Sequence, residues 1–150
     1  MRFDTILERC YFEKYVLDVS IATLERGGVT SNINTYQFLT STDAWAVPKY
    51  PDKALRVTPD KFFMRKIVQF IRNNEASLKE PDCWLGTWID PYTNICHLDI
   101  TTLYPCLEDA RCQALSLNQR AKNAIIALYD CKQQQTVYLW EDKKQAALPW

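Results

Sequence analysis

The amino-acid sequence predicts an α+β fold built on a mainly antiparallel sheet of three to five strands. Two observations indicate this class: amphipathic helical patterns begin near residues 59 and 105, and short β-branched or aromatic runs bounded by turn residues stand between and after them. We expect the two helices to pack on one face of the sheet, with a further helical segment at the N-terminus.

Residues 1–33 form the expected N-terminal segment. Phe3, Leu7, Cys10 and Tyr11 recur at helical spacing, which predicts a helix at its start. The run YVLDVSIATL that follows (15–24) is rich in β-branched residues and leaves helix and strand both open. Two glycines at 27 and 28 end the element in either case.

The stretch NTYQFLTSTDAWAV (34–47) is expected to be extended, and PKYPDKALRVTP (48–59) is a proline-bounded connector that cannot be a central strand. Thr58, Pro59 and Asp60 supply a hydroxyl cap, a first-turn proline and an acidic first turn, so a helix should begin there and run to about Leu78. Its predicted apolar face consists of Phe62, Phe63, Ile67, Phe70 and Ile71.

The opposite face of this helix is basic and has two interpretations. Its members are Lys61, Arg65, Lys66, Gln69 and Arg72. A solvated helix face is the favoured interpretation, and a docking surface for an acidic partner or for phosphates is the alternative.

A hairpin is predicted over WLGTWIDPYTNICHLDIT (84–101), with its loop at 91–94 closed by Asn94 in the left-handed conformation. This register places Trp88 opposite His97. The core face then holds Leu85, Ile89, Cys96, Leu98 and Ile100, and the second face holds Trp84, Trp88, His97, Asp99 and Thr101.

The last third of the chain is predicted to be a helix, two strands and a tail. Pro105 begins the helix, whose apolar positions Leu107, Ala110, Ala114, Leu117 and Ala121 are three and four apart. The apolar run AIIALYD (124–130) suits a strand inside the sheet, and the alternating TVYLW (136–140) suits an edge. The whole chain is predicted as one domain, with a core at 34–140 and a tail at 141–150.

Composition and charge restrict the class of protein. Eighteen basic residues balance eighteen acidic ones, which argues against nucleic acid and anionic membranes as partners. No signal-peptide pattern or membrane-length apolar run is visible, so we expect a cytoplasmic protein. The six cysteines, none in a C-x-x-C pair, are expected to be reduced and mostly buried.

Candidate site residues lie on the second face of the hairpin and on the basic helix. For the hairpin face, a structural role in which the N-terminal segment covers the tryptophans is the favoured interpretation, a binding surface is the alternative, and catalysis is the least favoured. The candidates for binding are Trp84, Trp88, His97, Asp99, Lys61, Arg65 and Arg72. Cys96 and His97 point to opposite faces, which argues against a joint metal site or a nucleophile and base pair. Asp99 is expected to raise the proton affinity of His97. No phosphate loop or hydrolase motif is present, and we expect no cofactor, no metal and no catalytic residue.

The pattern W-x-G-x-W-x-D-P-x-T-N resembles the G-x-W-x-D-x-x-T-G hairpin of a family of small uncharacterised proteins from phages and mobile elements. The matching positions over residues 59 to 130 are Gly86, Trp88, Asp90, Thr93, Leu98-Asp99-Ile100, Ala110, Asn118-Gln119 and Tyr129-Asp130. Asn94 stands where that family usually has glycine. The resemblance implies a phage-type accessory protein that acts in the host cytoplasm, and it implies no reaction.

The leading functional hypothesis is therefore a non-enzymatic binding protein that contacts a host or viral protein through exposed aromatic side chains, with Trp88 at the centre. The alternative is a small-molecule or nucleotide binder or weak hydrolase that uses His97 and Asp99. Nucleic-acid binding through the basic helix is a third hypothesis. A homodimer through the strand at 136–140 or the tryptophan face stays open.

Overall fold

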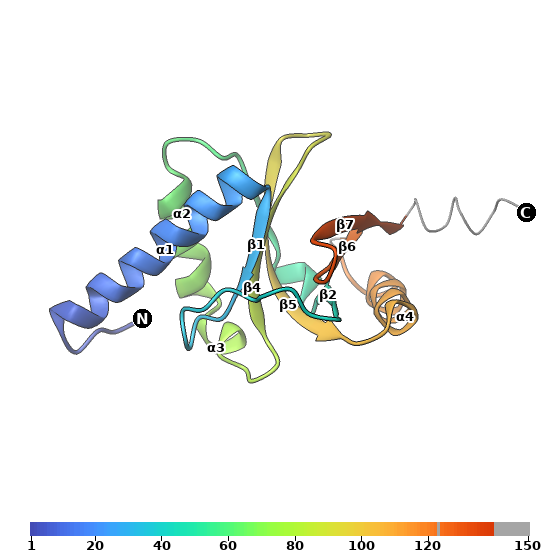
Figure 1. Ribbon diagram of the computed structural model, residues 1–150, viewed down its shortest axis with the longest axis horizontal. Coiled ribbons are helices and arrows are strands. Elements are labelled where there is room, and N and C mark those ends of the chain that lie inside the picture. The colour runs from blue at the N-terminus through green and yellow to red at the C-terminus, as the bar shows by residue number, and fades with distance from the viewer. Residues whose placement is uncertain (123, 140–150) are drawn as a thin grey trace, which may run out of the picture. The chain divides into compact units, whose positions relative to one another are not determined.

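The computed structural model describes residues 1–122 and 124–139 (Figure 1). Contacts divide the chain into two compact units: unit 1 consists of residues 1–39 and 53–100, and unit 2 of 40–52 and 101–150. The long strand β5 (Ile95–Tyr104) contributes its part up to Ile100 to unit 1 and the rest to unit 2. The α+β class and the antiparallel pairing are confirmed, but the seven strands exceed the three to five expected.

Unit 1 combines three helices with a small antiparallel sheet. Its helices are α1 (Ile6–Arg26), α2 (Phe63–Asn73) and α3 (Glu75–Leu78), and its strands are β1 (Gly28–Ser31), β3 (Leu55–Val57), β4 (Trp84–Asp90) and the start of β5. The strand order is β1-β4-β5-β3. The connector at 48–59 thus supplies β3. Within the described residues β3 pairs only with β5, which agrees with the expectation that the connector is not a central strand.

Helix α1 extends through the run that the sequence left open between helix and strand. The Thr5 hydroxyl caps its first turn by accepting the N–H of Glu8, and Gly27 ends it in the left-handed conformation at φ 87°. Gly28 follows at a close approach, because a Cβ there would collide with the Thr87 carbonyl oxygen in β4. The two glycines therefore end the helix and let the chain turn directly into β1.

The inner face of α1 packs against β1 and β4 in unit 1. Its buried side chains are Phe12, Tyr15, Val16, Val19, Ser20, Ala22 and Thr23. Two of them make buried hydrogen bonds to the sheet: the Tyr15 hydroxyl lies 2.6 Å from the Ser31 hydroxyl, and Thr23 pairs with Thr87. The β-branched residues at 15–24 favoured a strand locally, but their burial against this sheet stabilises them in a helix.

The β4–β5 hairpin agrees with its prediction. The loop lies at 91–94, where the Asp90 carboxylate accepts the N–H of Tyr92 and Asn94 closes the turn at φ 56°. Trp88 and His97 stack face to face, as expected for opposite residues. On the predicted core face, Leu85, Cys96, Leu98 and Ile100 are buried and Ile89 is half-buried.

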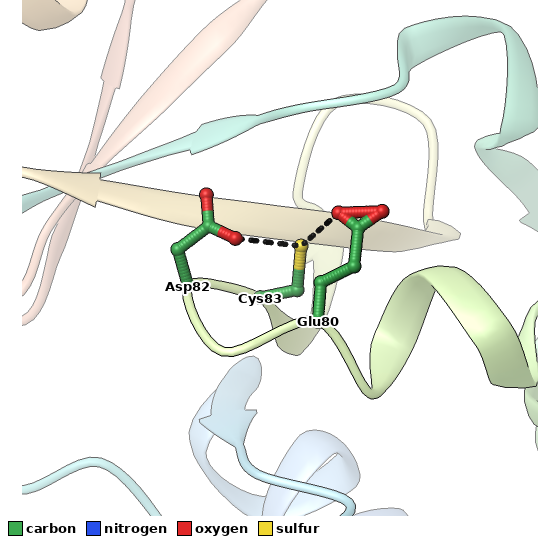
Figure 2. Close-up of side chains that lie close together, drawn as sticks. All are labelled: Glu80, Asp82 and Cys83. Atoms are coloured by element: carbon green, nitrogen blue, oxygen red, sulfur yellow. Dashed lines mark hydrogen bonds between the residues drawn. The ribbon is translucent and has the colours of Figure 1, made fainter.

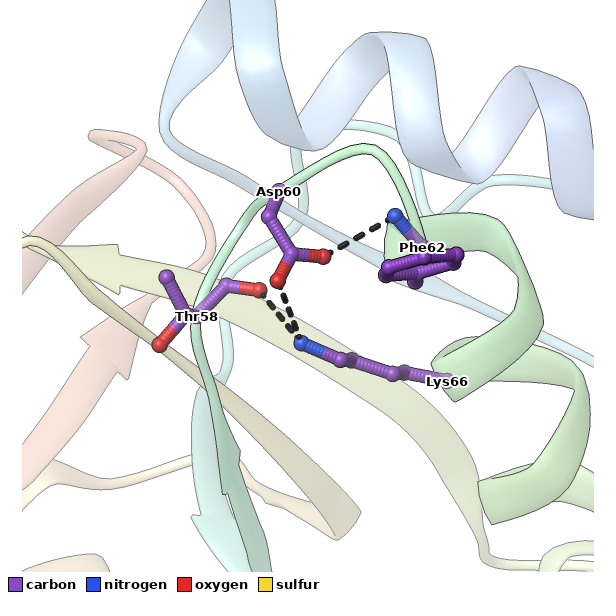
Figure 3. A network of polar contacts seen from close by, with 4 residues as sticks. All are labelled: Thr58, Asp60, Phe62 and Lys66. Carbon is purple, nitrogen blue, oxygen red and sulfur yellow. Dashed lines mark hydrogen bonds and ion pairs between the residues drawn. The ribbon is translucent and has the colours of Figure 1, made fainter.

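The predicted start of the 59–78 helix is wrong. Helix α2 begins at Phe63 because Asp60 closes a turn of its own: its carboxylate accepts the N–H of Phe62 and the ammonium of Lys66, which also bonds the Thr58 carbonyl (Figure 3). The predicted apolar face is buried except for Phe62, which is exposed. A break at Asn74 then separates α2 from α3, which ends at Leu78.

Unit 2 places α4 (Leu107–Asn118) beside the end of β5 and three further strands. These are β2 (Trp45–Pro48), β6 (Ala127–Asp130) and β7 (Gln135–Tyr138), in the order β5-β2-β6-β7. A 3-10 turn at Pro51–Lys53 follows β2. The core of the unit consists of Val47, Ala110, Ala114, Ile125 and Leu128.

Several predictions for this half need correction. Helix α4 begins at Leu107, not Pro105, and ends at Asn118, whose side-chain amide bonds both the N–H and the carbonyl of Ile125. Strand β6 lies inside the sheet, between β2 and β7, as predicted, but it is shorter than the predicted strand at 124–130. Within the stretch 34–47, which was expected to be extended, the only strand begins at Trp45, and Phe38 forms one isolated bridge. Helix α2 belongs to unit 1 and α4 to unit 2, and the packing of both helices on one face of the sheet stays a prediction. Trp140 and the tail at 141–150 lie outside the described residues.

We expect the buried hydrogen bond between the Tyr15 and Ser31 hydroxyls to couple the contributions of the two residues to the free energy of unfolding. Tyr15→Phe removes one hydroxyl and leaves the other buried without this bond, which should lower the free energy of unfolding by about 1–3 kcal/mol. The double variant with Ser31→Ala should cost less than the sum of the two single variants, as measured by urea unfolding. Strict additivity would show that the bond does not stabilise the packing of α1.

Candidate functional site

The predicted hairpin face is present in unit 1 but is largely covered. His97 is 8% and Asp99 6% exposed, and Trp84 and Trp88 are half-buried. The ring centroids of Trp88 and His97 lie 4.3 Å apart at 14°, and the Trp88 indole N–H donates to the Asp99 carboxylate. Arg56 of β3 is in register with His97 on the same face. The structure thus brings Trp88, His97 and Asp99 together as a stacked and hydrogen-bonded group.

The electrostatics of His97 are opposite to the prediction. Burial lowers the pKa of His97 below its ordinary value, the Arg56 guanidinium lowers it further, and the Asp90 carboxylate opposes both effects. Asp99 was expected to raise the proton affinity of His97, but burial raises the pKa of Asp99 itself to about 7, so that much of it is uncharged near neutral pH. The prediction was wrong because both His97 and Asp99 are buried, and the loss of hydration disfavours their charged forms more than their mutual attraction favours them.

This group is suited to internal structure more than to catalysis. A neutral imidazole stacked on Trp88 is held in place by packing, and its neighbour Cys96 lies on the opposite face. Burial raises the pKa of the Cys96 thiol to about 12, so it is not a thiolate nucleophile at neutral pH. Catalysis by His97 and Asp99, and binding through this face, stay predictions.

Of the basic helix residues, Lys61, Arg65 and Arg72 are exposed and Lys66 is half-buried, and two of them have an aromatic neighbour. The Lys61 ammonium lies 5.2 Å and the Arg65 guanidinium 5.4 Å from the centre of the exposed Phe62 ring. Lys66 is paired with Asp60 at 3.0 Å, and Arg72 stands exposed in the last turn of α2. These contacts are those of a solvated helix face, and binding of phosphates by it stays a prediction.

Glu80, Asp82 and Cys83 form the one group in the described residues whose donor atoms could approach a single metal ion (Figure 2). Their ligand atoms lie within 4.8 Å of one another. The Cys83 sulfur lies 3.7 Å from a Glu80 oxygen and 3.8 Å from an Asp82 oxygen, so its single S–H donates to one carboxylate at a time. These thiol hydrogen bonds explain the cluster without an ion.

The six cysteines are all free, as expected, but only three of them are buried. Cys83, Cys96 and Cys131 are buried, whereas Cys10, Cys106 and Cys112 are exposed. The prediction of mostly buried thiols is therefore wrong for half of them. The exposed Cys10 lies on α1, where it joins a row of apolar side chains.

That row is the feature that sequence reasoning missed. Opposite its buried face, α1 carries a row three and four residues apart, which we name the α1 seam: Leu7, Cys10, Lys14, Leu17, Ile21 and Leu24. Leu7 is 60%, Leu17 43%, Ile21 44% and Leu24 56% exposed. This is the a and d spacing of a helix that pairs with another helix. The sequence contains this signal, because the row continues through 15–24, where the sequence alone permits both helix and strand.

A groove runs along one flank of the α1 seam. It has a volume of about 350 Å³ and lies between α1 and the segment that follows β1. Its lining residues are Asp18, Ile21, Ala22, Glu25, Arg26, Tyr36 and Phe38. Ile21 therefore belongs both to the seam and to the groove wall. Tyr36, which has a positive φ of 61°, stacks on Tyr15.

None of the protein-family models, characterised proteins and solved structures compared with the chain matches it. Across the described residues, every helix is too short or too polar to cross a lipid bilayer. The evidence on function therefore comes from the residues and their geometry.

We predict that Asp99 makes the protein less stable as the pH rises. Its folded-state pKa of about 7 lies above the ordinary 3.8, so the folded protein retains this proton over a range in which the unfolded chain has lost it. The free energy of unfolding should therefore fall between about pH 4 and pH 7, by up to about 1.4 kcal/mol per pH unit from this group.

Asp99→Asn should remove this contribution, whereas Asp109→Asn, a matched change at an exposed position of α4, should leave it. Chemical unfolding of the three proteins at a series of pH values measures the difference. Equal slopes for Asp99→Asn and the parent protein would contradict the assignment.

Proposed function

We propose that the protein is a non-enzymatic interaction protein that binds another protein through the α1 seam. The observation that carries this proposal is the gathering of large apolar side chains on one outer helix face. Of the eleven large hydrophobic residues exposed in the described part of the chain, six lie on α1: Ile6, Leu7, Tyr11, Leu17, Ile21 and Leu24. Scattered exposed apolar residues are ordinary, but a contiguous patch marks an interaction surface.

The energetics support the same interpretation. Full burial of a leucine or isoleucine is worth about 1.5–3 kcal/mol relative to exposure, so side chains that are about half exposed retain roughly 1 kcal/mol each for a partner. The inner face of α1 already anchors the helix to unit 1, and the large apolar side chains of the outer face stay exposed. Its apolar character is therefore explained by a partner better than by the fold.

The class of partner follows from the shape of the surface. A straight row on a helix of 21 residues, about 32 Å long, suits a second helix that lies along it. The resemblance described above supports a phage-type accessory factor that acts on a host or viral protein, and that origin is part of the proposal.

Site-specific photo-cross-linking tests the proposal. A photoreactive amino acid at position 21 should form covalent adducts with protein in the cells that naturally make this chain. The same group at position 92, an exposed turn position in the hairpin, should form at least tenfold fewer. Adducts that are equal at the two positions, or absent from position 21, would rule out the α1 seam as the binding surface.

A further inference from the structure

We propose that the partner of the α1 seam is the α1 seam of a second copy, paired in the antiparallel direction, with Tyr11 of each copy in the groove of the other. This inference rests on the proposed function, because it names the partner of the same surface. It is carried by three features of α1: the spacing of the seam, the place of its one charged residue, and the position of the groove.

The spacing sets the layers of the pair. The seam residues alternate between steps of three and four, which is the condition for two helices to interlock side chains along their whole length. In an antiparallel pair centred between Lys14 and Leu17, three kinds of layer form: Leu7 faces Leu24, Cys10 faces Ile21, and Lys14 faces Leu17. Each layer occurs twice by the two-fold symmetry of the pair.

The charge of Lys14 selects the direction. In a parallel pair, Lys14 would face the Lys14 of the other copy in the centre of the seam, and Glu13 would lie beside the other Asp18 with like charge. In the antiparallel pair, the stem of Lys14 packs on Leu17 and its ammonium reaches the Asp18 of the other copy. Lys14 already forms an ion pair with its own Asp18 at 2.8 Å, so the two pairs join into one network of four charges.

The groove accepts the side chain that this pairing presents. Tyr11 is 56% exposed and lies on the same flank of α1 as Asp18 and Glu25, which line the groove. In the antiparallel register, Tyr11 of the second copy passes over Ile21 and Asp18 on that flank. Its ring can pack against Tyr36 and Phe38, and its hydroxyl can donate to the Asp18 carboxylate. A tyrosine in a pocket is the type of anchor that dominates protein interfaces.

Two substitutions at one position separate the two directions. In the antiparallel pair, Leu17→Lys places a lysine against Lys14 of the other copy, whereas Leu17→Glu places a carboxylate there. The Leu17→Lys protein should therefore have a dimer dissociation constant at least tenfold above that of Leu17→Glu, measured by analytical ultracentrifugation. Leu17 is partly exposed in the single copy, so circular dichroism should show both variants folded.

Equal dissociation constants for Leu17→Lys and Leu17→Glu would overturn the antiparallel direction, because a parallel pair places identical charges together in both variants. Tyr11→Ala tests the groove and should raise the dissociation constant at least tenfold. Its matched control is Tyr92→Ala, which removes an exposed tyrosine from the hairpin turn and should have no effect. No difference between these two tyrosine variants would overturn the groove assignment.

Cross-linking of cysteines tests the register directly. The test uses a protein with the exposed Cys106 and Cys112 changed to serine and with Ile21→Cys added, so that Cys10 faces the new thiol of the other copy. A short bis-maleimide should link two copies efficiently. It should fail in the protein that keeps Ile21, because the two Cys10 residues would lie more than about 15 Å apart along the antiparallel helices. Linkage through Cys10 alone would indicate a parallel pair and overturn the proposal.

The two proposals can fail separately. A protein that is monomeric at all concentrations, yet forms adducts from position 21 with a different protein, would refute the paired copy and leave the α1 seam as the binding surface. A monomer without such adducts would refute both. A dimer that survives Leu17→Lys and Tyr11→Ala unchanged would place the contact elsewhere on the molecule.

Discussion

The rotation of α1 about its own axis is the constraint on which the structure of unit 1 depends. Two buried hydroxyl pairs, Tyr15 with Ser31 and Thr23 with Thr87, join the helix to neighbouring strands near its middle and near its end. A buried hydroxyl without a partner is costly, so these pairs disfavour any rotation that a purely apolar contact would tolerate. With the inner face fixed, the apolar row of the opposite face is directed outward.

This constraint also determines which face of β4 carries the polar group. Thr87 and Leu85 direct one face of β4 to α1, which leaves Trp88 and Asp90 on the other face with His97 and Asp99. Burial keeps the imidazole uncharged and raises the pKa of Asp99, and the indole N–H satisfies the carboxyl. Such a group specifies how the strands pair, because its members satisfy one another only in the observed register.

The β4–β5 hairpin could be predicted in detail, because proline, asparagine and the alternation of side chains act within a few residues. Asn94 at positive φ and the opposition of Trp88 and His97 follow from those local rules. The sign of the pKa shift of His97 could not be predicted, because it depends on burial and on Arg56, which comes from a distant strand. The start of α2 was missed because Asp60 serves a turn in place of a helix cap.

The α1 seam could also be predicted from the sequence, except that residues 15–24 permit both helix and strand. The β-branched residues of 15–24 have low helix propensity, and only their burial against the sheet decides in favour of the helix. Once that helix is established, the spacing of Leu17, Ile21 and Leu24 identifies the seam. Tertiary contacts therefore decide both the structure of this segment and the surface that it presents.

Hydroxyl-radical footprinting of the purified protein at increasing concentration tests the central claim most directly, namely that the outer face of α1 is an interface for a second copy of the chain. We predict that Leu17, Ile21 and Leu24 become progressively protected as the concentration rises, while the exposed Tyr92 is labelled equally throughout. Labelling of the α1 seam that stays constant across the concentration range would contradict the claim that a second copy covers it.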